Sequence, residues 1–145
     1  MTSDVEQIQT VVKAVEAAME AKDVDRLLAR YTADAVTFDL APPLRRVGQE
    51  ALDAEGLAAW FAGFDGPVHY AVVDLEVTAG EDVAFCHALN RMASTPNGSP
   101  EGFVMWFRMT AGLRKEDGRW RIAHEHTSTP FHMDGSFRAA TDLEP

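Results

Sequence analysis

The fold is decided by one stretch of the chain, Gly118-Arg119-Trp120-Arg121-Ile122-Ala123-His124-Glu125-His126-Thr127-Ser128. Alternation at period two predicts a β-strand. It places Trp120, Ile122, His124, His126 and Ser128 on one face and the other side chains on the opposite face. Two imidazoles on a covered face cost free energy unless they bind, titrate or form hydrogen bonds. The stretch therefore predicts a strand with a functional site beside its polar end.

Length and composition limit the possible fold classes and binding partners. The chain has 145 residues, 46% of them hydrophobic and 25% charged, which suits one globular domain with a sizeable core. The formal net charge is −10, and basic residues are adjacent only at Arg45-Arg46 and Arg114-Lys115. A nucleic-acid or anionic membrane surface needs clustered basic side chains. We therefore expect no nucleic-acid partner and no membrane partner.

A single cysteine, Cys86, excludes an internal disulfide and fits a reducing compartment. Its neighbours are mostly apolar, which favours a buried, inert thiol over a nucleophile. The N-terminus has no basic segment followed by an apolar run, and no stretch reaches the ~20 apolar residues of a membrane span. We expect a soluble, cytoplasmic protein.

The N-terminal half predicts helices. Ser3 and Glu6 form a capping box, and apolar residues then recur at spacings of three and four to about Ala21. Asp23 caps a second, shorter helix, and a short strand over 35–39 ends before Pro42-Pro43. A third helix is expected from 49 to 62. Its buried side would comprise Leu52, Ala59, Trp60 and Phe64.

The C-terminal half predicts four antiparallel strands over 68–77, 83–92, 103–114 and 119–128, with an exposed loop over 94–100. Helices followed by strands indicate an α+β fold. A long sheet is twisted and curved, so helices across its concave side would leave a cone with a cavity. We expect one domain over 1–131 and a partly packed C-terminal extension over 132–145.

The turn between the last two strands decides which side chains face this cavity. A three-residue loop with Gly118 in the left-handed conformation places Arg108 opposite His126 and Thr110 opposite His124. A two-residue turn at Asp117-Gly118 would instead bring Phe107, Met109 and Ala111 to the side of the histidines. A slip of one residue reverses every side chain. We favour the three-residue loop, because a type I turn tolerates Glu and Asp better than a type I′ turn does.

With that register, a polar patch of Trp106, Arg108, His124, His126 and Ser128 lies on an apolar wall. A permanently charged guanidinium favours an anionic ligand group. The alternative is a surface pair of Arg108 with Glu125, with the histidines bonded to the main chain in the core.

Two further features stay open at the level of sequence. Asp39, between Phe38 and Leu40, is either a general base in apolar company or a cap of the proline turn. The spacing of His124 and His126 could offer two imidazoles to one metal, but no third ligand is evident nearby, so no metal site is predicted.

Three features together resemble a known family: the stretch Tyr31-Thr32-Ala33-Asp34-Ala35-Val36-Thr37-Phe38-Asp39, the later Gly48, and a hairpin that ends with Asp117 to Ser128. The family is the SnoaL-like, ketosteroid-isomerase-like proteins of the nuclear transport factor 2-like superfamily. The resemblance covers about residues 5–131. It implies the cone-shaped α+β fold with a curved antiparallel or mixed sheet around the helices. It also implies a ligand cavity, a homodimer on the outer sheet face, and inward positions for Trp106, Arg108, Thr110, His124 and His126.

Within this resemblance, Asp39 matches the catalytic base of the ketosteroid isomerases. Their oxyanion-hole tyrosine matches Val15 and their protonated acid matches Thr110, so steroid isomerisation by that mechanism is not expected. Functions in the superfamily range from isomerases and cyclases to binding and assembly domains, so the fold does not decide the activity.

The sequence predicts an acid/base enzyme without a cofactor, acting on a hydrophobic molecule with a carbonyl or carboxylate group. The alternative is a binding or assembly domain without turnover. Asp39, His126 and Arg108 are the predicted catalytic residues. The predicted ligand-binding residues are His124, Trp106, Thr110, Trp60, Tyr31, Asn90 and Ser128.

Overall fold

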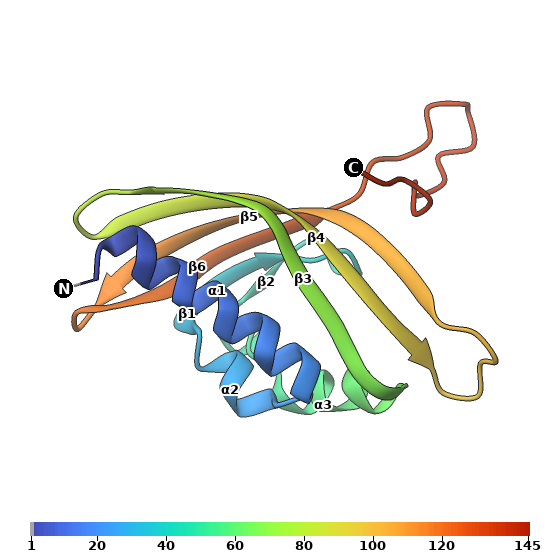
Figure 1. Cartoon of the computed structure of the whole chain (residues 1–145), viewed down its shortest axis with the longest axis horizontal. Coiled ribbons are helices and arrows are strands. Elements are labelled where there is room, and N and C mark those ends of the chain that lie inside the picture. The colour runs from blue at the N-terminus through green and yellow to red at the C-terminus, as the bar shows by residue number, and fades with distance from the viewer. Residues whose placement is uncertain (1) are drawn as a thin grey trace.

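A computed structural model describes residues 2–145 and confirms the α+β fold. Helices lie across one face of a long, curved sheet (Figure 1). The elements, in chain order, are α1 (Asp4–Ala21), α2 (Val24–Leu28), β1 (Tyr31–Phe38), β2 (Arg46–Val47), the 3-10 helix η1 (Gly48–Glu50), α3 (Ala54–Ala62), β3 (Phe64–Ala79), β4 (Val83–Pro96), β5 (Phe103–Glu116) and β6 (Arg119–Ser128). β1 starts earlier than predicted, at Tyr31, and β3, β4 and β5 extend beyond their predicted ends.

The first two helices begin where their caps predict. The Ser3 hydroxyl accepts from the Glu6 amide at 3.1 Å, and a Glu6 carboxylate oxygen accepts from the Ser3 amide at 3.0 Å. Asp23 accepts from the Arg26 amide and starts α2. The apolar stripe of α1 is buried, with Ile8 and Ala18 completely inaccessible. Burial of this stripe, more than helix propensity, holds α1 on the sheet.

The third helix differs from the prediction. The 3-10 turn η1 occupies its expected first residues, and α3 starts only after Asp53, whose carboxylate accepts from the Gly56 amide at 3.0 Å. Phe61, and not Trp60, is the buried residue of α3. Trp60 is 39% exposed and packs edge-on against Phe64. Trp60 was therefore wrongly expected to be buried, one position away from the residue that is, about 100° around the helix axis. Phe64, which follows the helix on β3, is partly buried against the core.

The sheet has the strand order β2-β1-β6-β5-β4-β3. All neighbours are antiparallel except β1 and β6, which run parallel. Helix α1 lies across the concave face of the sheet (Figure 1). The core between them includes Trp120 and Ile122 at the start of β6. β1 and β6 are neighbours within the sheet, although they are far apart in sequence.

The β5–β6 turn contradicts the favoured register. Glu116 pairs with Arg119, so Asp117 and Gly118 form a two-residue turn, both with positive φ (52° and 75°). The register then shifts by one residue between the pairs Leu113–Ile122 and Gly112–His124. Ala123 is thus the extra residue of a β-bulge. A bulge adds one residue to one strand and reverses the alternation beyond it.

This bulge decides the two faces of the sheet. Phe107, Met109, Ala111 and Leu113 are buried on the concave face, while Arg108 and Thr110 are exposed on the outer face. Beyond Ala123, Ser128 pairs with Arg108 and His126 with Thr110, so they share that outer face. The inward orientation expected for Trp106, Arg108, Thr110, His124, His126 and Ser128 is therefore wrong.

The segment after β6 is irregular and folds back on itself. Phe131 and Ala139 form an isolated bridge, the Ala140 amide donates to the Pro130 carbonyl, and Ala140 is 2% exposed. The apolar side chains of Phe131, Met133 and Phe137 are exposed. Among the described residues, no helix combines the length and apolar character that crossing a bilayer requires.

Candidate functional site

The bulge at Ala123 turns Glu125 toward the concave face. Glu125 pairs with Ala111 of β5 and with Thr37 of β1, two residues buried on that face. Ala111 is small and leaves space for the carboxylate. The Tyr31 hydroxyl donates to both Glu125 carboxylate oxygens, at 3.0 Å and 3.1 Å. A carboxylate from the centre of the sheet is therefore held by a phenol from the start of β1.

A second pair lies on β3 and β4. Asn90 pairs with Val72, which makes Tyr70 its diagonal neighbour on the same face. The Asn90 amide Nδ2 donates to the Tyr70 hydroxyl oxygen at 2.7 Å. The Asn90 Oδ1 atom is buried and has no hydrogen-bond partner within residues 2–145. Tyr31, Tyr70, Asn90 and Glu125 are named here the inner polar cluster.

Burial and neighbouring charges shift the pKa values of the titratable side chains in the inner polar cluster. Burial raises the pKa of Glu125 to about 7, against a usual 4.5. The Tyr31 hydrogen bond opposes this shift, and the negative charge of Asp39 adds to it. Burial, with the Glu125 charge, also raises the pKa of Tyr31 and of Tyr70 above the usual 10. Near neutral pH the cluster thus holds one carboxyl poised between its two states and two protonated phenols.

Asp39 lies at the edge of this cluster. It follows β1, its side chain is 40% exposed, and its Oδ2 lies 3.6 Å from Arg46 Nε and 3.4 Å from Thr37 Oγ1. The apolar surroundings expected for Asp39 are replaced by an ion pair and a hydroxyl. Its charge nevertheless acts on both Glu125 and Tyr31.

The histidines contact aromatic and main-chain groups on the outer face. His124 Nδ1 lies 2.7 Å from the Val36 carbonyl oxygen, and the Phe38 ring lies edge-on to both imidazoles, at 4.8 Å and 5.5 Å. Arg108 and His126 are exposed. Of the alternative expected from the sequence, the main-chain bond of His124 is found. Its surface pair of Arg108 with Glu125 is wrong, because Glu125 lies on the concave face with Tyr31.

The strand alternation concealed Glu125, because it assumed an unbroken strand. Tyr31 and Asn90 were predicted as ligand-binding residues and do lie in the inner polar cluster, whereas Glu125 and Tyr70 were missed. For Tyr70, the alternation of β3 from Val68 to Val72 was an available signal. For Glu125, nothing in the sequence marks Ala123 as a bulge.

No group of three or more His, Cys, Asp or Glu side chains within residues 2–145 is arranged to hold a metal ion. Cys86 is completely buried, and burial raises the pKa of its thiol to about 11. Such a thiol stays protonated near neutral pH and is a poor nucleophile.

A family model described as the SnoaL-like domain matches residues 8–132. The chain belongs to the SnoaL-like family. No curated protein sequence matches this SnoaL-like protein.

Solved structures carry the same fold. An NTF2-like protein of unknown function from Pseudomonas putida KT2440 is 28% identical, over the whole of both chains, with a TM-score of 0.82. A ketosteroid isomerase-like protein from Erwinia carotovora atroseptica SCRI1043 is 23% identical over 88% of this chain and 97% of that one, with a TM-score of 0.72. A proposed scytalone dehydratase from Novosphingobium aromaticivorans DSM 12444 is 15% identical over 95% and 91%, with a TM-score of 0.78.

Proposed function

We propose that this SnoaL-like protein is an acid/base catalyst that needs no cofactor and acts on a small hydrophobic molecule with a carbonyl or carboxylate group. The supporting observation is the Glu125 carboxyl, whose pKa of about 7 lies near neutral pH while a phenol holds its position. A general base or acid works best when its pKa is close to the working pH. Neighbours of the fold that are named isomerase-like and dehydratase are consistent with such chemistry.

In the proposed reaction the Glu125 carboxylate removes a proton from the carbon beside a substrate carbonyl. The electrons of the broken C–H bond form an enolate, and Glu125 can return the proton at another carbon or to a leaving group. Tyr31 fixes the carboxylate through its two hydrogen bonds.

Tyr70 supplies the donor for the developing oxyanion. Its oxygen already accepts from Asn90, so its own proton is directed elsewhere. A donor placed in advance at the developing charge is a large contribution to catalysis. The buried Asn90 Oδ1 has no hydrogen-bond partner within residues 2–145, which costs about 1–3 kcal/mol.

Asp39 contributes in this scheme as a nearby charge that raises the pKa of Glu125 and not as the base itself. Arg108 and His126 stand on the outer face and take no part in proton transfer. This assignment replaces the catalytic trio expected from the sequence.

Deuterium incorporation tests this function without knowledge of the natural substrate. The protein would be incubated in D2O with hydrophobic ketones and arylacetic acids, and exchange beside the carbonyl followed by NMR. The Glu125→Gln variant should lose roughly 10²-fold or more of the exchange rate. His126→Gln, on the outer face, is the matched control and should retain it. Exchange that survives in Glu125→Gln would reject Glu125 as the base, and substrate binding without exchange would favour the non-catalytic alternative.

The outer face supports a second proposal, a homodimer. Val83, Phe85 and Val104 point outward from β4 and β5 and are 60%, 52% and 49% exposed. The helices cover only the concave face (Figure 1). Val104 pairs with Ala93, far along β4 from Phe85, so these exposed apolar side chains are spread along the length of the outer face. We propose that a second copy of the chain covers this face.

A further inference from the structure

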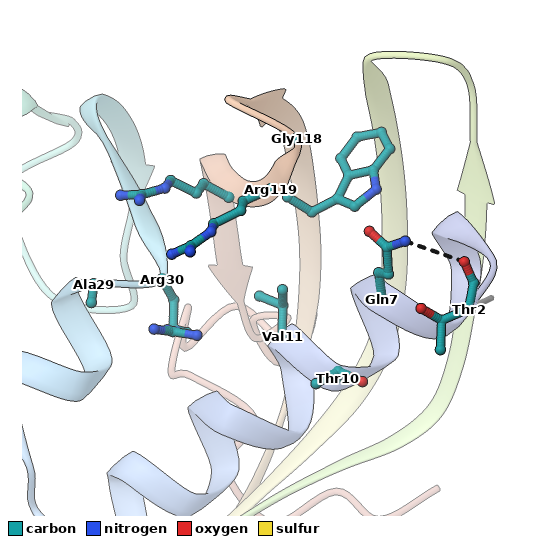
Figure 2. Close-up of a pocket in the computed structure, with 10 residues that line it drawn as sticks. Thr2, Gln7, Thr10, Val11, Ala29, Arg30, Gly118 and Arg119 are labelled. Carbon is teal, nitrogen blue, oxygen red and sulfur yellow. Dashed lines mark hydrogen bonds between the residues drawn. The ribbon is translucent and has the colours of Figure 1, made fainter.

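A pocket lies at the end of the molecule that carries the β5–β6 turn (Figure 2). Its volume is about 440 Å³, and it is formed by the first half of α1, the residues after α2 and the start of β6. Its lining includes Arg30, Arg119 and Arg121 and contains no Asp or Glu. Three of the 13 basic residues of an acidic chain therefore share one pocket.

These arginines lack the partners that other basic residues have. Arg46, Arg114 and Lys115 each lie within 4.0 Å of a carboxylate. Over residues 2–145, no such ion pair involves Arg30, Arg119 or Arg121. The Arg30 Nε atom is also buried without an acceptor in that part of the chain. Three guanidinium charges without a carboxylate partner repel one another and attract an anion.

Two neutral polar side chains of the pocket already donate to main-chain carbonyls. Gln7 Nε2 donates to the Thr2 carbonyl at 3.2 Å, the bond drawn in Figure 2, and Thr10 Oγ1 donates to the Glu6 carbonyl at 3.0 Å. Figure 2 shows Arg30 and Arg119 together on the side of the pocket away from this pair. The three guanidinium groups are thus the charged donors of the pocket.

We propose that this arginine pocket binds the phosphate group of a small organic molecule. A guanidinium offers two parallel N–H donors that match phosphate oxygens. A dianion offsets more of three positive charges than a single carboxylate does, and Val11 supplies an apolar wall for an organic group. The net charge of −10 opposes nucleic acid, because the rest of the surface repels a long polyanion.

The arginine pocket is separate from the inner polar cluster. Glu125 lies beyond the bulge from Arg119 and Arg121, and none of the four cluster residues lines the pocket. Phosphate binding would stand even if the proposed proton transfer failed.

Isothermal titration with phenyl phosphate, in a phosphate-free buffer at low salt, tests the site. Saturable binding is expected, with inorganic phosphate and benzoate binding more weakly. Arg119→Gln is the first variant, because Arg119 is exposed and its loss leaves the core intact. Arg30→Gln is the second, with folding checked by circular dichroism. Each should weaken binding by about tenfold.

Arg45→Gln, on the exposed loop after Pro43, removes the same charge elsewhere and should change the dissociation constant less than twofold. Three results would overturn the proposal: no saturable binding of phenyl phosphate, equal weakening by Arg45→Gln and Arg119→Gln, or tighter binding of benzoate than of phenyl phosphate.

Discussion

Glu125 is a titratable residue whose burial costs stability. A carboxylate on the concave face of a sheet loses hydration, and one phenol replaces only part of it. A structural role would be filled better by an apolar side chain opposite Ala111. A buried titratable group with one specific partner is therefore a sign of function.

The raised pKa of Glu125 predicts a pH-dependent stability. The pKa is about 7 in the folded state, against a usual 4.5. Below 4.5 both states carry the proton and the full stability is present. As pH rises from 4.5 to 7, only the unfolded state releases it, so stability falls, by on the order of 3 kcal/mol at most.

Urea unfolding at several pH values, for the wild type and Glu125→Gln, measures this loss. The stability of the wild type relative to the variant should decrease from pH 4.5 to 7 and level off above. The same comparison with Glu81→Gln, at the exposed β3–β4 turn, is the control. A difference between wild type and Glu125→Gln that does not change with pH would contradict a raised pKa.

Tyr31 provides a complementary test at the same site. Its hydrogen bonds stabilise the ionised form of Glu125 and hold the pKa down. Tyr31→Phe should therefore raise the pKa of Glu125, observed in a titration of ¹³C-labelled carboxyls by NMR. A lower value in the variant would show that Tyr31 does not act through these bonds.

At the scale of elements, the β5–β6 hairpin determines the site through two local irregularities. The two-residue turn at Asp117-Gly118 sets one alternation, and the bulge at Ala123 reverses it before Glu125. Without the bulge, Glu125 would lie on the outer face and His124 on the concave face. The hairpin turn and the bulge therefore select which titratable side chain enters the core.

Gly118→Ala tests the turn. Gly118 has φ of +75°, and an added Cβ would meet no atom within 4 Å, so any loss comes from backbone strain alone. We expect the variant to lose about 1 kcal/mol of unfolding free energy in urea denaturation. Gly112→Ala in the same hairpin is the control, because its Cβ would make only an ordinary 3.7 Å contact with His124 Cβ. Equal losses in both variants would reject the role of the positive φ.

The hairpin also shows what sequence alone can predict. Caps and apolar spacing predicted α1, α2 and the strand 119–128, because these signals are local and agree with the packing. The register was wrong because Asp117 adopts a positive φ that Asp tolerates but does not require. The predicted site residues on β6 were wrong because the extra residue at Ala123 exchanges the faces on which the following side chains lie. No residue type specifies a bulge at that position.

At the scale of the whole molecule, two groups of polar side chains, the inner polar cluster and the arginine pocket, lie at different places along one sheet. The inner polar cluster belongs to the concave face, beyond the bulge, whereas the arginine pocket lies before it, at the turn end of β6. The outer face beyond the bulge carries partly exposed apolar side chains together with Arg108, His124 and His126. A face with this composition suits contact with another protein surface better than a small ligand.

The proposed homodimer predicts the oligomeric state of this SnoaL-like protein. In sedimentation velocity the wild type should sediment as a dimer, and Phe85→Asp should shift it toward the monomer, since an unpaired carboxylate would be buried in the interface. Leu44→Asp is the control, because Leu44 is 97% exposed on the loop before β2. Each copy carries a net charge of −10, so added salt should strengthen the dimer by screening repulsion. A monomeric wild type at 0.15 M salt, or equal effects of Phe85→Asp and Leu44→Asp, would remove the outer face as the dimer interface and leave its apolar side chains for a different protein partner.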